Sequence, residues 1–156
     1  METVAKVVPR IKRECSRYRL RVGRSAINRL GVFAVESIPG NRKVIEYAGG
    51  RLSWGHTLSL LKELWRCERS TNIYLARLNR HWIINGAAEG NGSQFINHCC
   101  DPNLGVRRIR GRLLFFSRRN IRAGEELTSD YRFRKHAPKI PCHCGSPKCR
   151  GTINLK

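Results

Sequence analysis

The apolar positions along this chain are grouped in short segments that are separated by Gly, Pro and Asn. Segments of this length, rich in Val, Ile, Leu and Phe, are typical of β-strands. The pattern predicts strands at residues 20–22, 31–35, 44–48, 73–78, 82–84, 113–117 and 127–128. Residues 79–81 are expected to form a hairpin turn, and residues 86–92 a loop. Many short strands of this kind indicate a mainly β domain.

One segment has a different periodicity. Leu58, Leu61 and Trp65 recur at helical spacing, and Ser53 precedes them as a suitable N-cap residue. The pattern therefore predicts a helix over residues 53–67. Residues 1–17 have no such order and are expected to be a basic N-terminal arm, while the tail over residues 136–156 has too few apolar residues to form a core of its own.

Length and charge narrow the class of protein. The 156 residues fit one domain. No segment is long enough to span a bilayer, and the N-terminus lacks the apolar core of a secretory signal, so we expect a soluble intracellular protein. The 31 Lys and Arg against 11 Asp and Glu give a net charge of +20. Such a charge favours polyanions, or proteins bound to them, although it is also compatible with a solubility device or a GC-rich genome.

The seven cysteines point to a metal rather than to disulfides. Their number is odd and they cluster near the C-terminus, which favours metal binding in a reducing compartment. Cys142, Cys144 and Cys149 supply three thiolates, whereas a structural zinc site takes four ligands. His143 is poorly placed between two ligands, so the fourth is expected to be Cys99 or Cys100. Free or redox-active cysteines are the alternative.

Four motifs occur in order along the chain, and together they carry a family resemblance. They are Gly31-Val32-Phe33-Ala34 with Ile38-Pro39-Gly40, Glu46-Tyr47-Ala48-Gly49, Asn97-His98-Cys99-Cys100-Asp101-Pro102-Asn103, and Gly124-Glu125-Glu126-Leu127-Thr128-Ser129-Asp130-Tyr131, which is followed by a CxC-x4-C-R-G tail. Over residues 18–153 the chain resembles the SET-domain protein lysine methyltransferases with a post-SET zinc tail.

The resemblance implies a β-clip-like fold. Its small curved sheets surround a pseudoknot, in which the C-terminal segment passes under the loop that holds Asn-His. The SET domain would cover residues 18–135, with an insert at about 52–80 that helps to form the substrate groove. The family usually has Ser-Cys after Asn-His, which assigns Cys100 to zinc with Cys142, Cys144 and Cys149. Cys99 then takes the serine position as a small filling residue.

The activity implied is methyl transfer from S-adenosylmethionine to a lysine ε-amine. Tyr131 matches the catalytic tyrosine, and Tyr74 matches a tyrosine that lines the lysine channel or reaches the cofactor. Asn97 and His98 match the cofactor-binding pair. The same comparison gives weaker roles, which are pocket support for Tyr47 and adenine contacts for Phe133 and His143. For Tyr47 and Tyr74, a purely structural role in the core is the alternative.

Two departures from the family pattern bear on the site. The cofactor loop usually has Gly-x-Gly, but here Arg29 stands at the first glycine, followed by Leu30 and Gly31. We expect the backbone at Arg29 to avoid the conformation that glycine favours, with cofactor contact kept through the main chain of the next two residues. Ser129 stands where Phe or Tyr limits the number of methyl groups. The smaller side chain predicts di- or trimethylation, unless an ordered water restores the limit.

The expected protein substrate is a histone tail or another chromatin protein, held by an acidic pocket for which Glu46, Glu63, Glu68 and Glu89 are available. DNA contacts are expected through one of two basic clusters, Arg107, Arg108, Arg110 and Arg112 or Arg118, Arg119 and Arg122. The expected location is the nucleus or chromosome in a eukaryote, and the cytoplasm or a secreted effector in a bacterium. No membrane contact is expected.

Two rival functions remain. The replacement of glycine by Arg29 is compatible with a catalytically inactive SET-like module that binds DNA or chromatin. A nucleic-acid binder that only needs zinc is less compatible with the sequence, because it has no use for Asn97, His98 and Tyr131 together.

Overall fold

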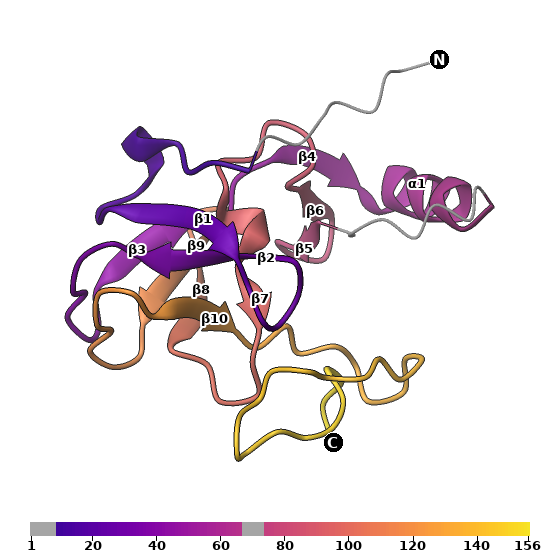
Figure 1. Ribbon diagram of the computed structural model, residues 1–156. Coiled ribbons are helices and arrows are strands. Elements are labelled where there is room, and N and C mark those ends of the chain that lie inside the picture. Colours follow the sequence, from indigo (N-terminus) through magenta and orange to yellow (C-terminus); the bar gives the residue numbers. More distant parts are fainter. Residues whose placement is uncertain (1–8, 67–73) are drawn as a thin grey trace.

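The computed structural model describes residues 9–66 and 74–156, and it shows a mainly β protein with one α-helix (Figure 1). Its elements are η1 (Arg13–Cys15), β1 (Leu20–Arg24), β2 (Leu30–Ala34), β3 (Lys43–Glu46), β4 (Gly50–Ser53), α1 (Trp54–Arg66), β5 (Leu75–Arg77), β6 (Trp82–Asn85), η2 (Ser93–Phe95), β7 (Asn97–His98), β8 (Leu104–Ile109), β9 (Arg112–Ser117) and β10 (Glu126–Ser129).

The larger sheet has the strand order β1-β2-β10-β8-β9-β3, with β7 added beside β10. Its apolar side chains form the core, in which Val32, Ile45, Leu104 and Leu127 are at most 1% exposed. Burial of such aliphatic side chains is the main source of stability in a domain of this size. This part of the molecule therefore folds in the ordinary way, around a hydrophobic core.

Strand β10 brings three distant segments together. It pairs with β2 in antiparallel orientation, with β7 in parallel through Thr128↔Asn97 and Ser129↔His98, and with β8 through Ser129↔Leu104. The C-terminal strand thus lies directly beside the Asn-His segment, as the resemblance implies. The pseudoknot threading itself stays a prediction.

The smaller sheet has the order β4-β6-β5, and α1 follows β4 directly. The helix extends away from both sheets (Figure 1). It begins at Trp54, and the Ser53 hydroxyl accepts a hydrogen bond from the backbone N–H of His56 at 3.4 Å. The predicted helix and its N-cap are therefore confirmed. Its last predicted residue, Cys67, lies outside the described residues, as does Ile73 at the start of a predicted strand.

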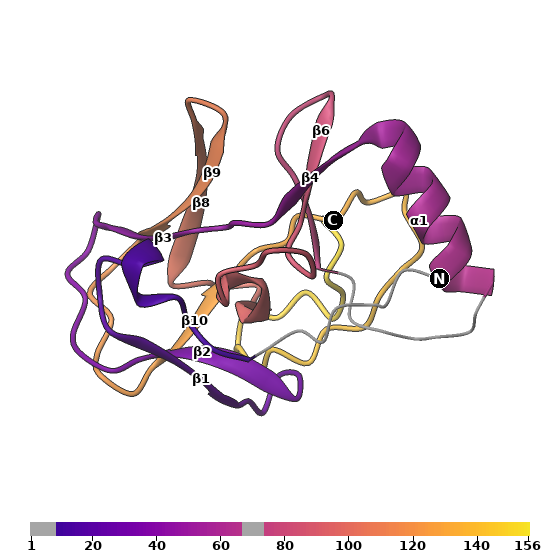
Figure 2. The same ribbon diagram turned by 90° about the horizontal axis from the view of Figure 1, so that it is seen from above.

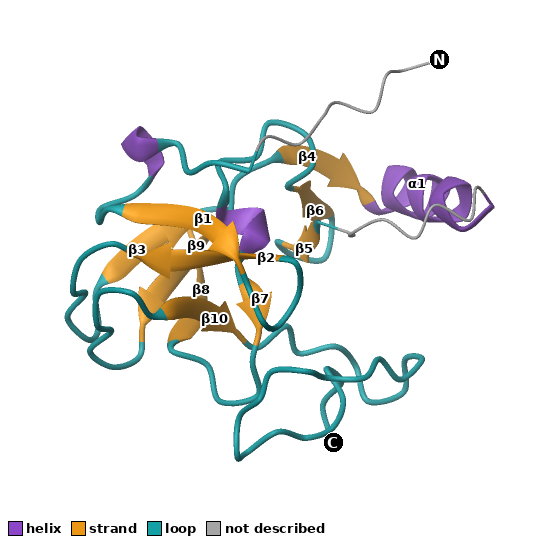
Figure 3. Cartoon of the chain, in the orientation of Figure 1, coloured by secondary structure: helices purple, strands orange, loops and turns teal. Residues whose placement is uncertain are grey.

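The C-terminal tail after β10 has no strand, only the isolated bridges Phe133↔Asn154 and Pro141↔Thr152 (Figure 3). The fully buried Asn154 organises it. Its side-chain amide donates to the carbonyl of Arg134 at 3.0 Å, and its side-chain oxygen accepts from the N–H of Ile140 at 3.0 Å. The tail is thus held by side-chain hydrogen bonds together with isolated backbone bonds, where the body has continuous ladders.

The N-terminal arm packs against the body from Ile11 onward, and the N–H of Lys12 donates to the carbonyl of Asn91 at 3.0 Å. The strands lie between Leu20 and Ser129, but the proposed boundaries at residues 17/18 and 135/136 stay a prediction. Across residues 9–66 and 74–156, no helix combines the length and the apolar character that a membrane crossing requires.

Candidate active site and cysteine cluster

A cleft of about 2000 Å³ opens between the larger sheet, the smaller sheet with α1, and the C-terminal tail. This volume exceeds that of a typical small-molecule pocket, so the cleft has room for a cofactor and a peptide together. Most of the predicted site residues line it, namely Arg29, Leu30, Tyr47, Tyr74, Asn97, Ser129, Tyr131 and Phe133. His98, Gly31 and His143 do not: His98 is buried behind the cleft wall, and His143 is exposed on the tail.

Tyr131 follows β10 and points its hydroxyl into the body of the protein. Its O–H donates to the carbonyl of Ile96 at 2.8 Å. Although 40% of the residue as a whole is exposed, the hydroxyl end is enclosed, and this burial, with Tyr74 and Glu126 nearby, raises the pKa of Tyr131 well above its usual value. The phenol is therefore neutral at physiological pH, with its donor already engaged and its oxygen lone pairs available.

A second tyrosine hydroxyl is held in the same manner. The O–H of Tyr47 donates to the carbonyl of Tyr74 at 2.8 Å, and burial, followed by the proximity of Tyr131 and Tyr74, raises the pKa of Tyr47. The ring of Tyr74 meets Phe95 edge to face, with centroids 5.5 Å apart and an interplanar angle of 72°. Tyr47, Tyr74 and Tyr131 thus all line the cleft.

Asn97 fixes the loop that precedes β2. Its side-chain amide is buried and donates to the carbonyl of Leu30 and to Glu126 Oε1, both at 2.8 Å. The hydroxyl of Ser25 donates to the same carboxylate oxygen at 2.8 Å. A Cβ at Gly31 would lie 2.2 Å from Glu126 Oε1, so a larger residue there would displace this carboxylate from its hydrogen bonds. Sequence reasoning missed Ser25 and Glu126, although Glu126 lies within one of the family motifs.

The expectation for the backbone at Arg29 is wrong. Its φ of +39° lies in the left-handed region that glycine favours. The carbonyl of Arg29 accepts a hydrogen bond from the N–H of Ser25 at 3.2 Å, which closes a turn over residues 25–29. The turn keeps the glycine-type conformation even with an arginine in place, so the strain is offset by the contacts around it.

His98 links the tyrosine to the cysteine cluster. Its Nδ1 accepts a hydrogen bond from the N–H of Tyr131 at 3.1 Å, and its Nε2 lies 3.4 Å from the sulfur of Cys100. Burial lowers the pKa of His98; the charge of Asp130 opposes this shift and that of Arg150 adds to it. The ring is therefore neutral. Since Nδ1 is an acceptor, the proton is assigned to Nε2, which donates to the sulfur.

The structure brings together the four cysteines that the resemblance assigned to zinc, Cys100, Cys142, Cys144 and Cys149, with their sulfur atoms all within 4.8 Å of one another. A tetrahedral zinc site with bonds of about 2.3 Å has sulfur–sulfur separations of about 3.8 Å. Cys100 and Cys142 are 3.7 Å apart, so the arrangement fits such an ion. Cys99 is not in the cluster, and its thiol points to the carbonyl of Asp101 at 3.4 Å.

Backbone groups around the cluster favour thiolates, the form that binds metal. The N–H of Arg150 points at the sulfur of Cys100, and that of Gly151 at the sulfur of Cys149, both at 3.4 Å. Burial alone would raise the pKa of Cys144, but hydrogen bonds from the backbone of Cys100 and Ser146 and from the thiols of Cys142 and Cys149 lower this pKa to about 6. For Cys100 and Cys142 burial prevails and raises the pKa.

One ion pair joins the tail to the end of β10. Arg150 donates to both carboxylate oxygens of Asp130, each at 2.9 Å, and the two side chains are only 15% and 22% exposed. Desolvation would raise the pKa of Asp130, but the bonds from Arg150 hold it below its usual value. Bidentate pairs of this kind add geometric specificity as well as energy. Sequence reasoning did not find this pair, because the partners are distant in the chain.

Of the four glutamates expected to form an acidic peptide pocket, the two whose side chains the structure describes do not line the cleft. Glu46 pairs with Arg112, and neither Glu46 nor Glu89 lines the cleft. The side chain of Glu63 and the whole of Glu68 lie outside the described residues. Within the described part of the lining, Asp130 supplies the only carboxylate, and it is already paired with Arg150.

Comparison with known proteins agrees with this geometry. The chain is 41% identical over 139 residues to the "Histone-lysine N-methyltransferase, H3 lysine-4 specific" of Schizosaccharomyces pombe, covering 86% of this chain and 15% of that protein. It is 36% identical over 140 residues to human "Histone-lysine N-methyltransferase SETD1A", covering 87% of this chain and 8% of that protein. It is 35% identical over 137 residues to Drosophila melanogaster "Histone-lysine N-methyltransferase trithorax", covering 85% of this chain and 4% of that protein. The chain thus spans at most 15% of the length of these three relatives. The model of the family described as "SET domain" matches residues 29–132, and the chain belongs to this family.

Proposed function

We propose that this chain transfers a methyl group from S-adenosylmethionine to the ε-amine of a lysine in the tail of histone H3, with lysine 4 as the target. Relatives with 41% and 36% identity carry the name of histone-lysine N-methyltransferases, one of them specific for H3 lysine 4. The observation that carries the proposal is the position of Tyr131, whose engaged, neutral phenol lines a cleft shared with Asn97 and Tyr74.

The cleft fits the chemical groups of this cofactor. Aromatic rings of Tyr74, Tyr131 and Phe133 line it, and Arg24 and Arg29 can meet a carboxylate. We assign cofactor contact to these residues, to Asn97 and to the main chain of Leu30. When bound, S-adenosylmethionine supplies an activated methyl group, so the protein's task is to align the amine with it.

Tyr131 is proposed to orient the amine rather than to remove its proton. Its own O–H is committed to the carbonyl of Ile96, so its oxygen can only accept a hydrogen bond from the substrate N–H. A lysine with a pKa near 10.4 is neutral in only about one molecule in a thousand near pH 7.4. The apolar side chains of Phe95 and Phe115 in the cleft favour the neutral amine, because desolvation lowers an amine's pKa.

The cysteine cluster is proposed to hold zinc as a structural ion. Four thiolates close the coordination of zinc, so the ion takes no part in the chemistry. Its role is to hold the tail, which contributes Phe133, Ile140 and Ile153 to the cleft. We propose the nucleus or a chromosome as its location, because the proposed histone substrate lies there and reducing conditions keep the four cysteines available for zinc.

Ser129 is proposed to set the degree of methylation. The side chain is 3% exposed and lines the cleft next to Leu104, its strand partner. A serine leaves space that the Phe or Tyr expected at this position from the family resemblance would fill. A dimethylated amine can then rotate into position for a further transfer, so the expected products are di- and trimethyllysine.

The test is transfer of a radiolabelled methyl group to a peptide of the H3 tail, with a second peptide carrying arginine at position 4. We expect label only on the first. Tyr131→Phe should reduce the rate about 100-fold or more, as loss of an oriented polar contact does in other enzymes. Tyr18→Phe is the matched control, since this tyrosine lies outside the cleft, and it should change the rate less than about twofold.

Two results would contradict the proposal. One is labelling that does not respond to Tyr131→Phe. The other is an absence of labelling together with no heat of S-adenosylmethionine binding in calorimetry, which would instead identify an inactive module that binds chromatin.

A further inference from the structure

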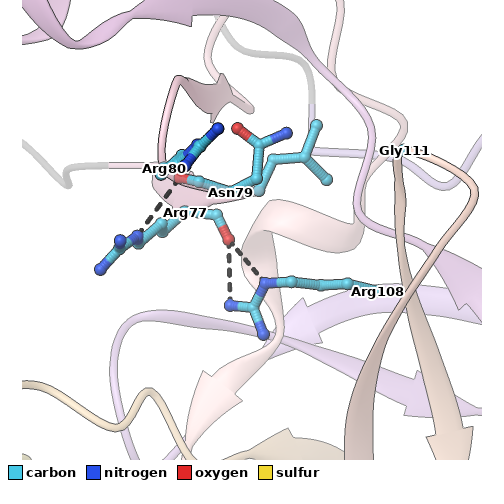
Figure 4. Close-up of a pocket in the computed structure, with 6 residues that line it drawn as sticks. Arg77, Asn79, Arg80, Arg108 and Gly111 are labelled. Atoms are coloured by element: carbon cyan, nitrogen blue, oxygen red, sulfur yellow. Dashed lines mark hydrogen bonds between the residues drawn. The ribbon is translucent and has the colours of Figure 1, made fainter.

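Two hairpins project side by side from the body of the protein (Figure 2). One is formed by β5 and β6 and the other by β8 and β9. A pocket of about 510 Å³ lies between them, lined by Arg77, Leu78, Asn79, Arg80, Arg108 and Gly111 (Figure 4). Apart from Leu78, its side chains are polar or basic, which makes it unlike the aromatic cleft.

Backbone carbonyls hold the arginines of this region in place. The guanidinium of Arg108 donates to the carbonyl of Arg77 through Nε at 3.2 Å and through a terminal nitrogen at 3.0 Å, which ties the two hairpins together (Figure 4). Arg51, on β4, donates to the carbonyl of Gly111 at the tip of the second hairpin at 2.9 Å. The guanidinium of Arg77 also lies over the ring of Trp54, 5.8 Å from its centroid.

These side chains form one positively charged area, the hairpin arginine surface, which consists of Arg51, Arg77, Arg80, Arg108 and Arg110. All five residues are exposed, and among the described residues none of the five has a carboxylate within ion-pair distance. Like charges held this close repel one another, and they bind an anion favourably.

Other arginines of the same strands are different. Arg112 is paired with Glu46, and Arg107 stacks on Phe116 with its guanidinium 4.4 Å from the ring centroid. Side chains alternate along a strand, so Arg107 and Arg108 leave β8 on opposite faces. The second basic cluster begins at the other end of β9, about 17 Å from the tip, and there Arg119 is paired with Glu125. Both clusters therefore contain arginines without an ion pair among the described residues, but only those of the first adjoin the pocket between the two hairpins.

We propose that the hairpin arginine surface binds phosphates of double-stranded DNA, beside the cleft that receives the histone tail. Guanidinium groups match phosphate oxygens with two parallel hydrogen bonds. Arg77 and Arg108 line both the pocket and the cleft, so bound DNA would lie next to the peptide. The arrangement of DNA beside the peptide rests on the proposed function, because a histone tail emerges from a core that is wrapped in DNA. The surface selects for phosphate and not for base sequence.

The experiment compares two double variants by fluorescence anisotropy with a labelled duplex of about 20 base pairs, over a series of salt concentrations. Arg80→Glu with Arg110→Glu changes the surface at two exposed residues outside the cleft. Arg118→Glu with Arg122→Glu makes the same change of charge in the other cluster. We expect the first variant to bind at least about tenfold more weakly and to lower the slope of log K against log salt by about 1.8, for two lost phosphate contacts. The second variant should bind within about threefold of the unaltered protein.

Three outcomes would overturn the inference. The first is an equal loss of DNA affinity in both variants, and the second is a loss of DNA affinity only in the Arg118/Arg122 variant. The third is tighter binding of a polyglutamate peptide than of DNA at the same salt concentration, which would indicate an acidic protein partner. Methylation of the free H3 peptide is measured in parallel and should not change in the first variant. If the unaltered protein binds DNA through these arginines but labels no peptide, the proposed function fails while the surface stands.

Discussion

The two walls of the cleft are built in different ways. The sheet wall carries Asn97, Ser129 and Leu30 on or next to strands that pack over a fully buried core. The tail wall carries Phe133 and Ile153 on a segment with no strand. Continuous backbone ladders and apolar burial hold the first wall, whereas side-chain contacts and a few isolated backbone hydrogen bonds hold the second.

Because of this difference, the folding of the core and the completion of the cofactor cleft are separate events. The sheet wall forms together with the core, because its residues are part of the strands that bury the core side chains. Besides isolated backbone bonds, the tail wall depends on three sets of side-chain contacts, which are the four cysteines, the pair between Arg150 and Asp130, and the buried side chain of Asn154. Loss of any one of them should therefore weaken cofactor binding while the larger sheet stays folded.

The largest expected effect comes from breaking the cluster with Cys142→Ser. The metal content should fall from about one zinc per chain to none, and methyl transfer should drop at least about 100-fold, because structural zinc contributes on the order of 10 kcal/mol to the segment that it holds. Circular dichroism should still report the β-sheets. Metal analysis and peptide labelling measure the two effects.

Cys99→Ser is the matched control, since its thiol lies outside the cluster. It should keep both the metal and most of the activity. If Cys99→Ser lost zinc and Cys100→Ser kept it, the assignment of the fourth ligand would be reversed.

The next effect tests the sheet wall through Ser129→Tyr. A tyrosine fills the space beside the amine, so the main product should shift from di- and trimethyllysine to monomethyllysine, with little change in metal content. Mass spectrometry of the peptide reads the distribution directly. An unchanged distribution would mean that Ser129 does not set the degree of methylation.

A smaller effect is expected from Arg150→Gln, which removes one partner of a pair that is mostly buried. The free energy of unfolding should fall by about 1–2 kcal/mol, and the affinity for S-adenosylmethionine should fall several-fold because the tail loosens. Thermal unfolding and calorimetry measure these changes. Arg122→Gln, on the exposed surface, should leave both within error; equal losses in the two variants would show only a general effect of charge.

The smallest effect is a gain of stability from Arg29→Gly. Removing the side chain relieves the left-handed backbone at φ +39°, which costs an L-residue about 1–2 kcal/mol, less the chain entropy that glycine adds to the unfolded state. Arg29→Ala removes the same charge and keeps the strain, so it should not stabilise the protein. Equal midpoints of urea unfolding for the two variants would show that the turn is unstrained.

Local patterns in the sequence predicted much of the fold. Helical spacing and the Ser53 cap predicted α1, and β-branched segments predicted most strands of the core. Strand β8 was missed because four of its six residues are exposed and two are arginines, so it reads as polar surface. Strand β4 was missed because Gly49 and Gly50 look like a turn, although Gly50 starts the strand.

The contacts that complete the site were harder to predict. Asn97 reaches Glu126, and Arg150 reaches Asp130, over long distances in the chain, and no local periodicity marks such pairs. The cysteine spacing indicated a metal, but the choice between Cys99 and Cys100 came only from the family resemblance. The position of His98, between Tyr131 and Cys100, emerged only from the folded chain.

The central claim is that a zinc-held tail completes the binding site for S-adenosylmethionine. Its most direct test is calorimetry of cofactor binding to the zinc-loaded protein, to the same protein after chelation, and after zinc is added back, with circular dichroism recorded on each sample. We predict binding in the first state, none in the second and recovery in the third, while the β-sheet signal persists throughout. Equal binding before and after removal of zinc would contradict the claim.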